Sequence, residues 1–412
     1  MISNLIRRRK RRGLRLWPVG LVLAATFAFA VLVAAGVFLA GWDLLGAQEL
    51  KPERRLASTT LFDLVKLSFG VVAGAGALVA LVVAYRRQRV DEDGALREAT
   101  RLHTERFTTA VSQLGQESAA VRLGGVHALA GLADDAPTPL LRQTCIDVLC
   151  AYLRLPYTAQ DDLPADDVAA QHAYLALREV RHTIIRLIRD RTVIGSEDTH
   201  VSWQAHDFDF TGVVFDGGDF TGVVFTAGAT ASFRGAQFSG GEVSFIKAQF
   251  VGGTVDFSGA QFSGGRVFFD LARFAEGRVS FAMAQFAGGM VDFNGARFTG
   301  GMVRFTGALL SGSRVSFGGA KFSGSVVVFH GTDLTDGRVD FTRARFSAGA
   351  VVFFFTEFAE GTVDFQSAEF CGGAVDFSDS AGPAPAHLLP APGQPLPDGL
   401  HGLPAAWMSQ AP

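Results

Sequence analysis

Phenylalanine recurs at a fixed spacing through the second half of this 412-residue chain, and no other feature constrains the fold as strongly. One set of Phe residues is spaced by twelve: Phe257, Phe269, Phe281, Phe293, Phe305, Phe317 and onward to Phe377. A second set follows each member of the first by five residues, from 262 to 370, with Leu at 310 and 334. Spacing this strict predicts a solenoid, in which equivalent side chains stack coil upon coil and form the structural core.

The residue two positions before each Phe indicates which side of the strand is buried. Val precedes the first set, as at Val255, and mostly Ala precedes the second, as at Ala260. Because alternate residues of a strand share a face, each Val–Phe or Ala–Phe pair is expected to point inward. Glycine pairs such as Gly264–Gly265 fall in the longer arm of the repeat, where a wide corner is expected to need positive φ.

One unit reads A-x-F-x-x-G-x-V-x-F-x-x, which resembles the A-(D/N)-L-x-x pattern of the bacterial pentapeptide-repeat family over about residues 207–377. The resemblance implies a mainly β domain over 203–381, a right-handed quadrilateral β-helix. The chain departs from the family pattern, since Phe replaces Leu, Val replaces Ala on alternate faces, and every second face gains two residues. A coil is therefore predicted to hold 24 residues. About seven such coils, at ~4.8 Å each, would rise roughly 35 Å.

Two apolar runs near the amino terminus predict transmembrane helices at 17–42 and 61–85, and hence a lipid bilayer as a partner. A cleaved signal peptide is the competing interpretation of the first run, which exceeds a usual signal core and is followed by a second run. Basic residues crowd the arm at 1–16 and the segment after 85, but are diluted in the loop at 43–60. The positive-inside rule then predicts a two-helix, multi-pass protein of the cell membrane with both termini cytoplasmic and the loop external. Gly70 and Gly74 have the spacing that allows two such helices to pack as a homodimer, although chance also produces it.

Residues 93–191 show helical periodicity and predict a small bundle of short antiparallel helices, which we term the connector. Its last helix carries Arg178, Arg181, Arg186 and Arg189, which suit either lipid headgroups and a partner or a solvated face. The tail at 382–412 is rich in proline, a composition that predicts disorder.

A 24-residue coil would stack basic side chains on one another. The row of Arg273, Arg297, Lys321 and Arg345 is the candidate interaction surface, and Arg314 and Arg338 would form a second short row that widens it. A solvated face is the alternative interpretation of such a row. In the functional interpretation, an acidic protein or an anionic lipid surface relieves the repulsion between the stacked charges.

The function expected from these features is that of a membrane-anchored, non-catalytic scaffold that displays the solenoid to a protein partner. The net charge of −3 gives no reason to expect a nucleic-acid partner. Repeat-phase carboxylates such as Asp256 and Asp292 stand apart from any His or Cys, so we expect no catalytic residue, cofactor or metal. The resemblance supplies one alternative, an acidic DNA mimic that binds gyrase, and an uncharacterised enzyme or effector is a third.

Overall fold

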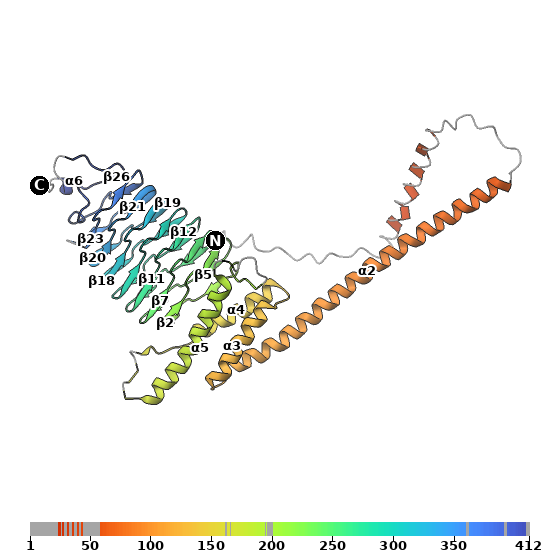
Figure 1. The fold of residues 1–412 in the computed structure, drawn as a ribbon, viewed down its shortest axis with the longest axis horizontal. Coiled ribbons are helices and arrows are strands. Elements are labelled where there is room, and N and C mark those ends of the chain that lie inside the picture. The colour runs from red at the N-terminus through yellow and green to blue at the C-terminus, as the bar shows by residue number, and fades with distance from the viewer. Residues whose placement is uncertain are drawn as a thin grey trace. The chain divides into compact units, whose positions relative to one another are not determined.

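The structure is a computed structural model that falls into two units, Met1–Thr100 and Arg101–Pro412, and each is described by itself. It describes residues 58–160, 163–164, 166–193, 195, 201–359, 362–390 and 394–408, with scattered residues between 24 and 43. The first unit contains most of helix α2 (Ser58–Leu114), which runs for 57 residues without a break. Figure 1 shows α2 as the longest element of the chain.

Among the described residues, α2 alone is long and apolar enough to cross a membrane, and its apolar part, which starts at Val65, is unburied. The described residues therefore contain one candidate membrane helix, where two were predicted for the whole chain. The first predicted helix at 17–42 and the loop at 43–60 lie largely outside the described residues. Helix α2 extends beyond the predicted span at 61–85, through the basic residues that follow it and into the connector.

The remaining helices of the connector belong to the second unit. They are α3 (Ala119–Asp134), α4 (Pro139–Leu153) and α5 (Val168–Thr192). The starts of α4 and α5 are capped by side chains, since the Thr138 hydroxyl accepts from the Leu141 amide at 3.3 Å and the Asp167 carboxylate accepts from the Ala170 amide at 2.9 Å. The apolar faces of the three helices meet in a core of fully buried residues that includes Leu129.

The rest of the second unit is a parallel β-solenoid of about eight turns, close to the seven expected, with a repeat near 24 residues. Figure 1 shows its strands advancing in order from β2 beside α5 to β26 near α6. Each regular turn contributes four short strands. In the turn that starts at β9 (Thr254–Asp256), the chain passes through β10 (Gln261–Phe262), β11 (Arg266–Phe268) and β12 (Arg273–Ala275). The next strand, β13 (Arg278–Ser280), pairs in parallel with β9, which completes the turn.

The same four positions recur along the chain as four columns of parallel strands. The first column adds β1 (Phe208–Asp209), β5 (Thr230–Ser232), β17 (Met302–Arg304) and β25 (Ala374–Asp376); the second adds β2 (Val214–Phe215), β6 (Gln237–Phe238), β14 (Gln285–Phe286) and β22 (Glu357–Phe358). The third adds β3 (Gly218–Asp219), β7 (Glu242–Ser244), β15 (Met290–Asp292) and β23 (Val363–Asp364); the fourth adds β4 (Val224–Thr226), β8 (Gln249–Val251), β16 (Arg297–Phe298) and β24 (Glu369–Phe370).

Four longer strands join neighbouring columns into two sheets. The strands β18 (Leu309–Ser316) and β20 (Asp333–Asp340) belong to both the second and third columns. The strands β19 (Lys321–Val328) and β21 (Arg345–Val352) belong to both the fourth and first columns. The described strands therefore form a 14-stranded sheet from the fourth and first columns and a 12-stranded sheet from the second and third.

Stacked phenylalanine rings fill the interior of the solenoid. The six residues predicted as its core, from Phe257 to Phe317, are at most 1% exposed. Phe281 lies parallel to Phe257 and Phe305, with 4.8 Å between ring centroids in both cases. Rings that follow strands of the first and third columns meet edge to face, as where Phe257 and Phe269 cross at 86° with centroids 5.7 Å apart. Both geometries are those that aromatic rings prefer, so the repeat satisfies face and edge contacts together.

Glycine is required at the wide corners of the longer arm. Gly265 and Gly301 have φ of +69° and +70°. A Cβ atom at Gly265 would lie 2.4 Å from the Gly241 carbonyl oxygen, and one at Gly301 would lie 2.2 Å from that of Gly277. Both the backbone conformation and the close approach of the neighbouring coil therefore exclude a side chain.

Part of the proline-rich tail is ordered against the last coil, which differs from the disorder that its composition predicts. Strand β26 (Leu400–His401) pairs with β25, and the short helix α6 (Ala405–Met408) follows. Trp407 is fully buried, lies 5.4 Å from Phe377 between ring centroids, and donates a 2.8 Å hydrogen bond to the Gly382 carbonyl. One aromatic side chain thus closes the column of rings that the repeat leaves open.

Replacing a central ring should destabilise the solenoid strongly. Phe317 is stacked between Phe293 and Phe341 at 4.9 and 5.0 Å. Phe317→Ala removes both contacts and leaves a cavity, so we expect a loss of about 3–5 kcal/mol in the free energy of unfolding. Chemical denaturation followed by circular dichroism measures it. Phe355→Ala is the matched control, because Phe355 is 58% exposed and its loss should cost about 0.5 kcal/mol or less. Equal midpoints for both variants would contradict the stacked core.

Candidate functional site

The row of basic residues predicted from the 24-residue repeat is present as a row of direct neighbours across strands β12, β16, β19 and β21. Arg273 pairs in register with Arg297, Arg297 with Lys321, and Lys321 with Arg345. All four side chains are exposed. Each is followed by a buried Phe, and those rings stack at 4.7, 4.7 and 4.8 Å along the same column. The core therefore fixes the spacing of the surface charges.

Three of the four side chains of this row form no ion pair with the residues that the structure describes. Arg345 lies 3.4 Å from Glu369 on the next coil, and both side chains are more than half exposed. Of the ion pairs formed within the described residues, none involves Arg273, Arg297 or Lys321. Like charges opposite one another on adjacent strands are destabilising, so the row keeps an unfavourable arrangement that an anion would relieve.

A groove runs beside the row, with a volume of about 520 Å³. Its lining alternates cations with hydroxyls: Arg297, Thr299, Lys321, Ser323, Arg345 and Ser347. The Thr299 hydroxyl donates to the Phe274 carbonyl at 3.4 Å and the Ser347 hydroxyl to the Phe322 carbonyl at 3.3 Å, so both rest on the preceding coil. These six residues are called the basic groove below. Its chemistry is that of anion binding by guanidinium and ammonium groups.

The second predicted row lies elsewhere. Arg314 and Arg338 pair in register on β18 and β20, which belong to the other sheet. Arg314 binds the Asp340 carboxylate at 3.4 Å and lines a separate groove of about 460 Å³ together with Asp292. The structure therefore does not place these two arginines in the basic groove, because β18 turns a different side of the coil outward.

The repeat-phase aspartates have a structural role. The carboxylates of Asp256, Asp340, Asp364 and Asp376 each accept a hydrogen bond of 2.8–2.9 Å from the backbone amide two residues later. This Asx geometry fixes the corner that follows each strand. Asp292 differs because it is buried. Burial is the main cause that raises the pKa of its carboxyl, and the nearby charge of Asp270 adds to the effect. Within the described part of the chain, no group of acids, His and Cys has the arrangement to hold a metal ion.

A buried polar cluster joins the connector to the first turn of the solenoid, and its central group is Asp216. The hydroxyls of Tyr157 and Tyr174 donate to one Asp216 oxygen at 2.5 and 2.6 Å. The His182 ring nitrogen lies 3.2 Å from the other oxygen, and the Arg178 Nε lies 3.3 Å from the oxygen that the two tyrosines share. Burial by itself would raise the pKa of Asp216, but the hydrogen bonds from His182, Tyr157 and Tyr174 outweigh it and hold that pKa well below its usual value.

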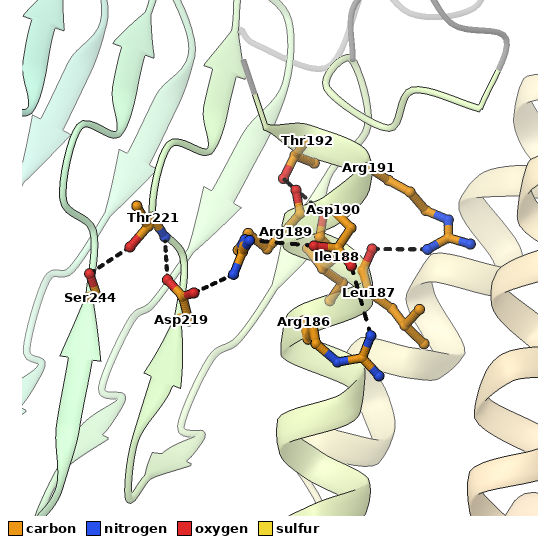
Figure 2. A network of polar contacts seen from close by, with 10 residues as sticks. All are labelled: Arg186, Leu187, Ile188, Arg189, Asp190, Arg191, Thr192, Asp219, Thr221 and Ser244. Carbon is orange, nitrogen blue, oxygen red and sulfur yellow. Dashed lines mark hydrogen bonds and ion pairs between the residues drawn. The ribbon is translucent and has the colours of Figure 1, made fainter. Parts of the chain in front are cut away.

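The arginines of α5 also tie this helix to the solenoid. Arg181 is 3% exposed and donates to the carbonyls of Leu153 and Val214 at 2.7 and 2.6 Å. Figure 2 shows Arg189 reaching the carboxylate of Asp219, which in turn accepts from the Thr221 amide at 2.9 Å. Three of the four arginines considered for lipid or partner contact, all except Arg186, therefore bind the solenoid. Arg186 pairs along the helix with Asp190 at 3.8 Å.

The sequence analysis missed this junction because its members are distant in the chain. Asp216 lies 59 residues after Tyr157 and 42 after Tyr174. The one local signal is the Asp216-Gly217-Gly218 segment, which interrupts the regular repeat in the first turn. Gly218 packs under α5, where an added Cβ would lie 3.2 Å from Ile185.

The fold and the junction together define the class of protein, a parallel β-solenoid with a helical amino-terminal region. Comparisons with protein-family models, curated proteins and solved structures find no match to this chain.

Loss of the Asp216 charge should weaken the junction. Asp216→Asn leaves two tyrosine hydroxyls without their anionic acceptor, so we expect about 3–5 kcal/mol lower stability at neutral pH. Because its pKa is lower in the folded than in the unfolded chain, the carboxylate stabilises the fold above about pH 4, and this is lost as the pH falls further. Denaturation midpoints measured between pH 7 and 2 should therefore decline less in the variant. Asp379→Asn, at an exposed corner, is the control. Matching pH profiles for Asp216→Asn and the unmodified chain would contradict the assignment.

Proposed function

We propose that this chain is a membrane-anchored, non-catalytic interaction scaffold whose solenoid contacts a protein partner through the basic groove. The observation that carries the proposal is the row of exposed cations held in register over four successive coils. A solenoid with a uniform core and an exposed row of charges is better suited to binding a partner than to catalysis. Repeat solenoids offer long, rigid binding faces.

We place the solenoid in the pentapeptide-repeat class, as a right-handed quadrilateral β-helix of bacterial type. Four short strands per turn and inward-facing Phe at alternate strand positions support this assignment. The DNA-mimic alternative is less well supported, because a duplex mimic needs a sustained acidic stripe, whereas the exposed row in the fourth column is cationic. The repeat-phase aspartates do not support an enzymatic role, because most of their carboxylates accept hydrogen bonds from backbone amides.

The anchor in this proposal consists of two membrane helices with both termini in the cytoplasm. The unburied apolar part of α2 supports one of them, and the apolar run at 17–42 supports the other. Leu114 at the end of α2 is buried in the helical core of the second unit, so the helix that provides the apolar segment also forms part of the connector.

The topology has a direct test. Reporter fusions at Met1 and directly after Arg89 should both give a cytoplasmic signal, because basic flanks are retained on the cytoplasmic side. A fusion placed between the two apolar runs, near Gly46, should give an external signal and is the internal control. An external signal at Met1 or after Arg89 would rule out this topology.

The scaffold function is tested by reversing the charge of the groove in the full-length protein. The triple change Arg297→Glu, Lys321→Glu and Arg345→Glu should lower the amount of crosslinked protein partners recovered from membranes by roughly tenfold, and recovery by the unmodified chain should fall as salt rises. The matched control carries Arg266→Glu, Arg278→Glu and Arg304→Glu, exposed residues of other strand columns. Equal recovery of the same partners by all three proteins would show that the groove is only a solvated face.

A further inference from the structure

The spacing of the basic row restricts the form of any partner that neutralises it. The four cations advance along the solenoid axis with the rings behind them, in steps of 4.7, 4.7 and 4.8 Å. The row from Arg273 to Arg345 therefore spans about 14 Å, perpendicular to the strands. A partner that meets all four charges must present four anions along one line whose total length is close to this span.

A single α-helix and a single extended strand each present side chains along a line, and the two differ in interval. Carboxylates at positions i, i+3, i+7 and i+10 of an α-helix lie on one face and span about 15 Å at a rise of 1.5 Å per residue. Alternate residues of an extended strand lie on one face but span about 20 Å over four side chains. The helix matches the row within about 1 Å by these dimensions, whereas the strand departs by about 6 Å.

We propose that the basic groove, together with Arg273 at the end of the row, binds an α-helix of a partner protein that carries a stripe of four carboxylates at i, i+3, i+7 and i+10. This inference rests on the proposed scaffold function and names the chemistry of its partner. Arginine and lysine along the row donate to the carboxylates, and the small hydroxyl residues Thr299, Ser323 and Ser347 leave room beside the row for the body of the helix.

The ends of the row set the length of the stripe. Gln249, which is neutral, precedes Arg273 in the column, and Glu369 follows Arg345. A fifth carboxylate at the Glu369 end would face a like charge, whereas a basic residue one turn further along the helix would pair with Glu369. The matching stripe is therefore four acids followed by one base at that end.

The test measures binding of synthetic peptides to the full chain in phosphatidylcholine nanodiscs by fluorescence anisotropy. The first peptide is an alanine-rich helix with Glu at i, i+3, i+7 and i+10. The second has the same composition, but its four Glu are spread around the helix. The third is a Thr- and Val-rich extended peptide with Glu at alternate positions. We expect the first peptide to bind at least tenfold tighter than the other two, since each aligned pair adds to the total.

The variants locate the binding. The change Arg297→Glu, Lys321→Glu and Arg345→Glu should abolish the preference for the first peptide, and the control change at Arg266, Arg278 and Arg304 should preserve it. Equal binding of all three peptides, tighter binding of the extended one, or no binding of the first would overturn the inference. So would displacement of the first peptide by phosphatidylserine vesicles but not by phosphatidylcholine vesicles, which would identify a lipid surface as the ligand.

The two proposals fail in different ways. If the groove variant loses its membrane partners while the striped peptide does not bind the unmodified chain, the scaffold function stands and the helical partner is wrong. If the groove variant recovers the same partners as the unmodified chain, the groove is not the scaffold's binding surface, whichever peptide binds.

Discussion

The columns of phenylalanine rings determine the pitch of the solenoid, and the backbone pairing and surface follow from that pitch. Rings one coil apart in the regular turns lie 4.6–5.2 Å between centroids, close to the distance between hydrogen-bonded strands. Ring stacking and strand pairing therefore favour the same rise per coil. Where Phe is missing, Leu310 and Leu334 occupy the gap on adjacent coils, so a single column changes residue type without changing register.

Because each coil contacts only its neighbours, both ends of such a stack need other structures to cover them. At the amino-terminal end, α5 lies against the first turn through Asp216 and Arg181, with Gly218 allowing the close approach. At the other end, Trp407 places its indole ring beside Phe358 and Phe377. One cap is a buried polar cluster and the other is an aromatic ring.

The sequence predicts what is periodic in this protein and misses what is not. The coil length, the inward Phe and the register of Arg297 with Lys321 all follow from one spacing, because stacking makes sequence distance equivalent to spatial adjacency. The Asp216 cluster brings together residues far apart in the chain, for which no spacing rule exists. Trp407 lies in a proline-rich segment whose composition predicts disorder. Its buried side chain nevertheless packs against the last coil, and this part of the tail is ordered. The basic residues after 85 do not end α2, because charged residues such as Arg and Glu are good helix formers.

The basic groove shows how a core of this kind constrains its surface. In an ordinary sheet, like charges on adjacent strands reduce their repulsion by small shifts in register, or are separated by bulges. Here Phe298 and Phe322 stack at 4.7 Å directly behind Arg297 and Lys321, so a shift of the charges along the strand would require the rings to leave their contacts. The remaining ways to lower the repulsion are splaying of the side chains, screening by salt and binding of an anion. The aromatic core that stabilises the solenoid therefore also keeps the row of cations aligned for a ligand of matching interval.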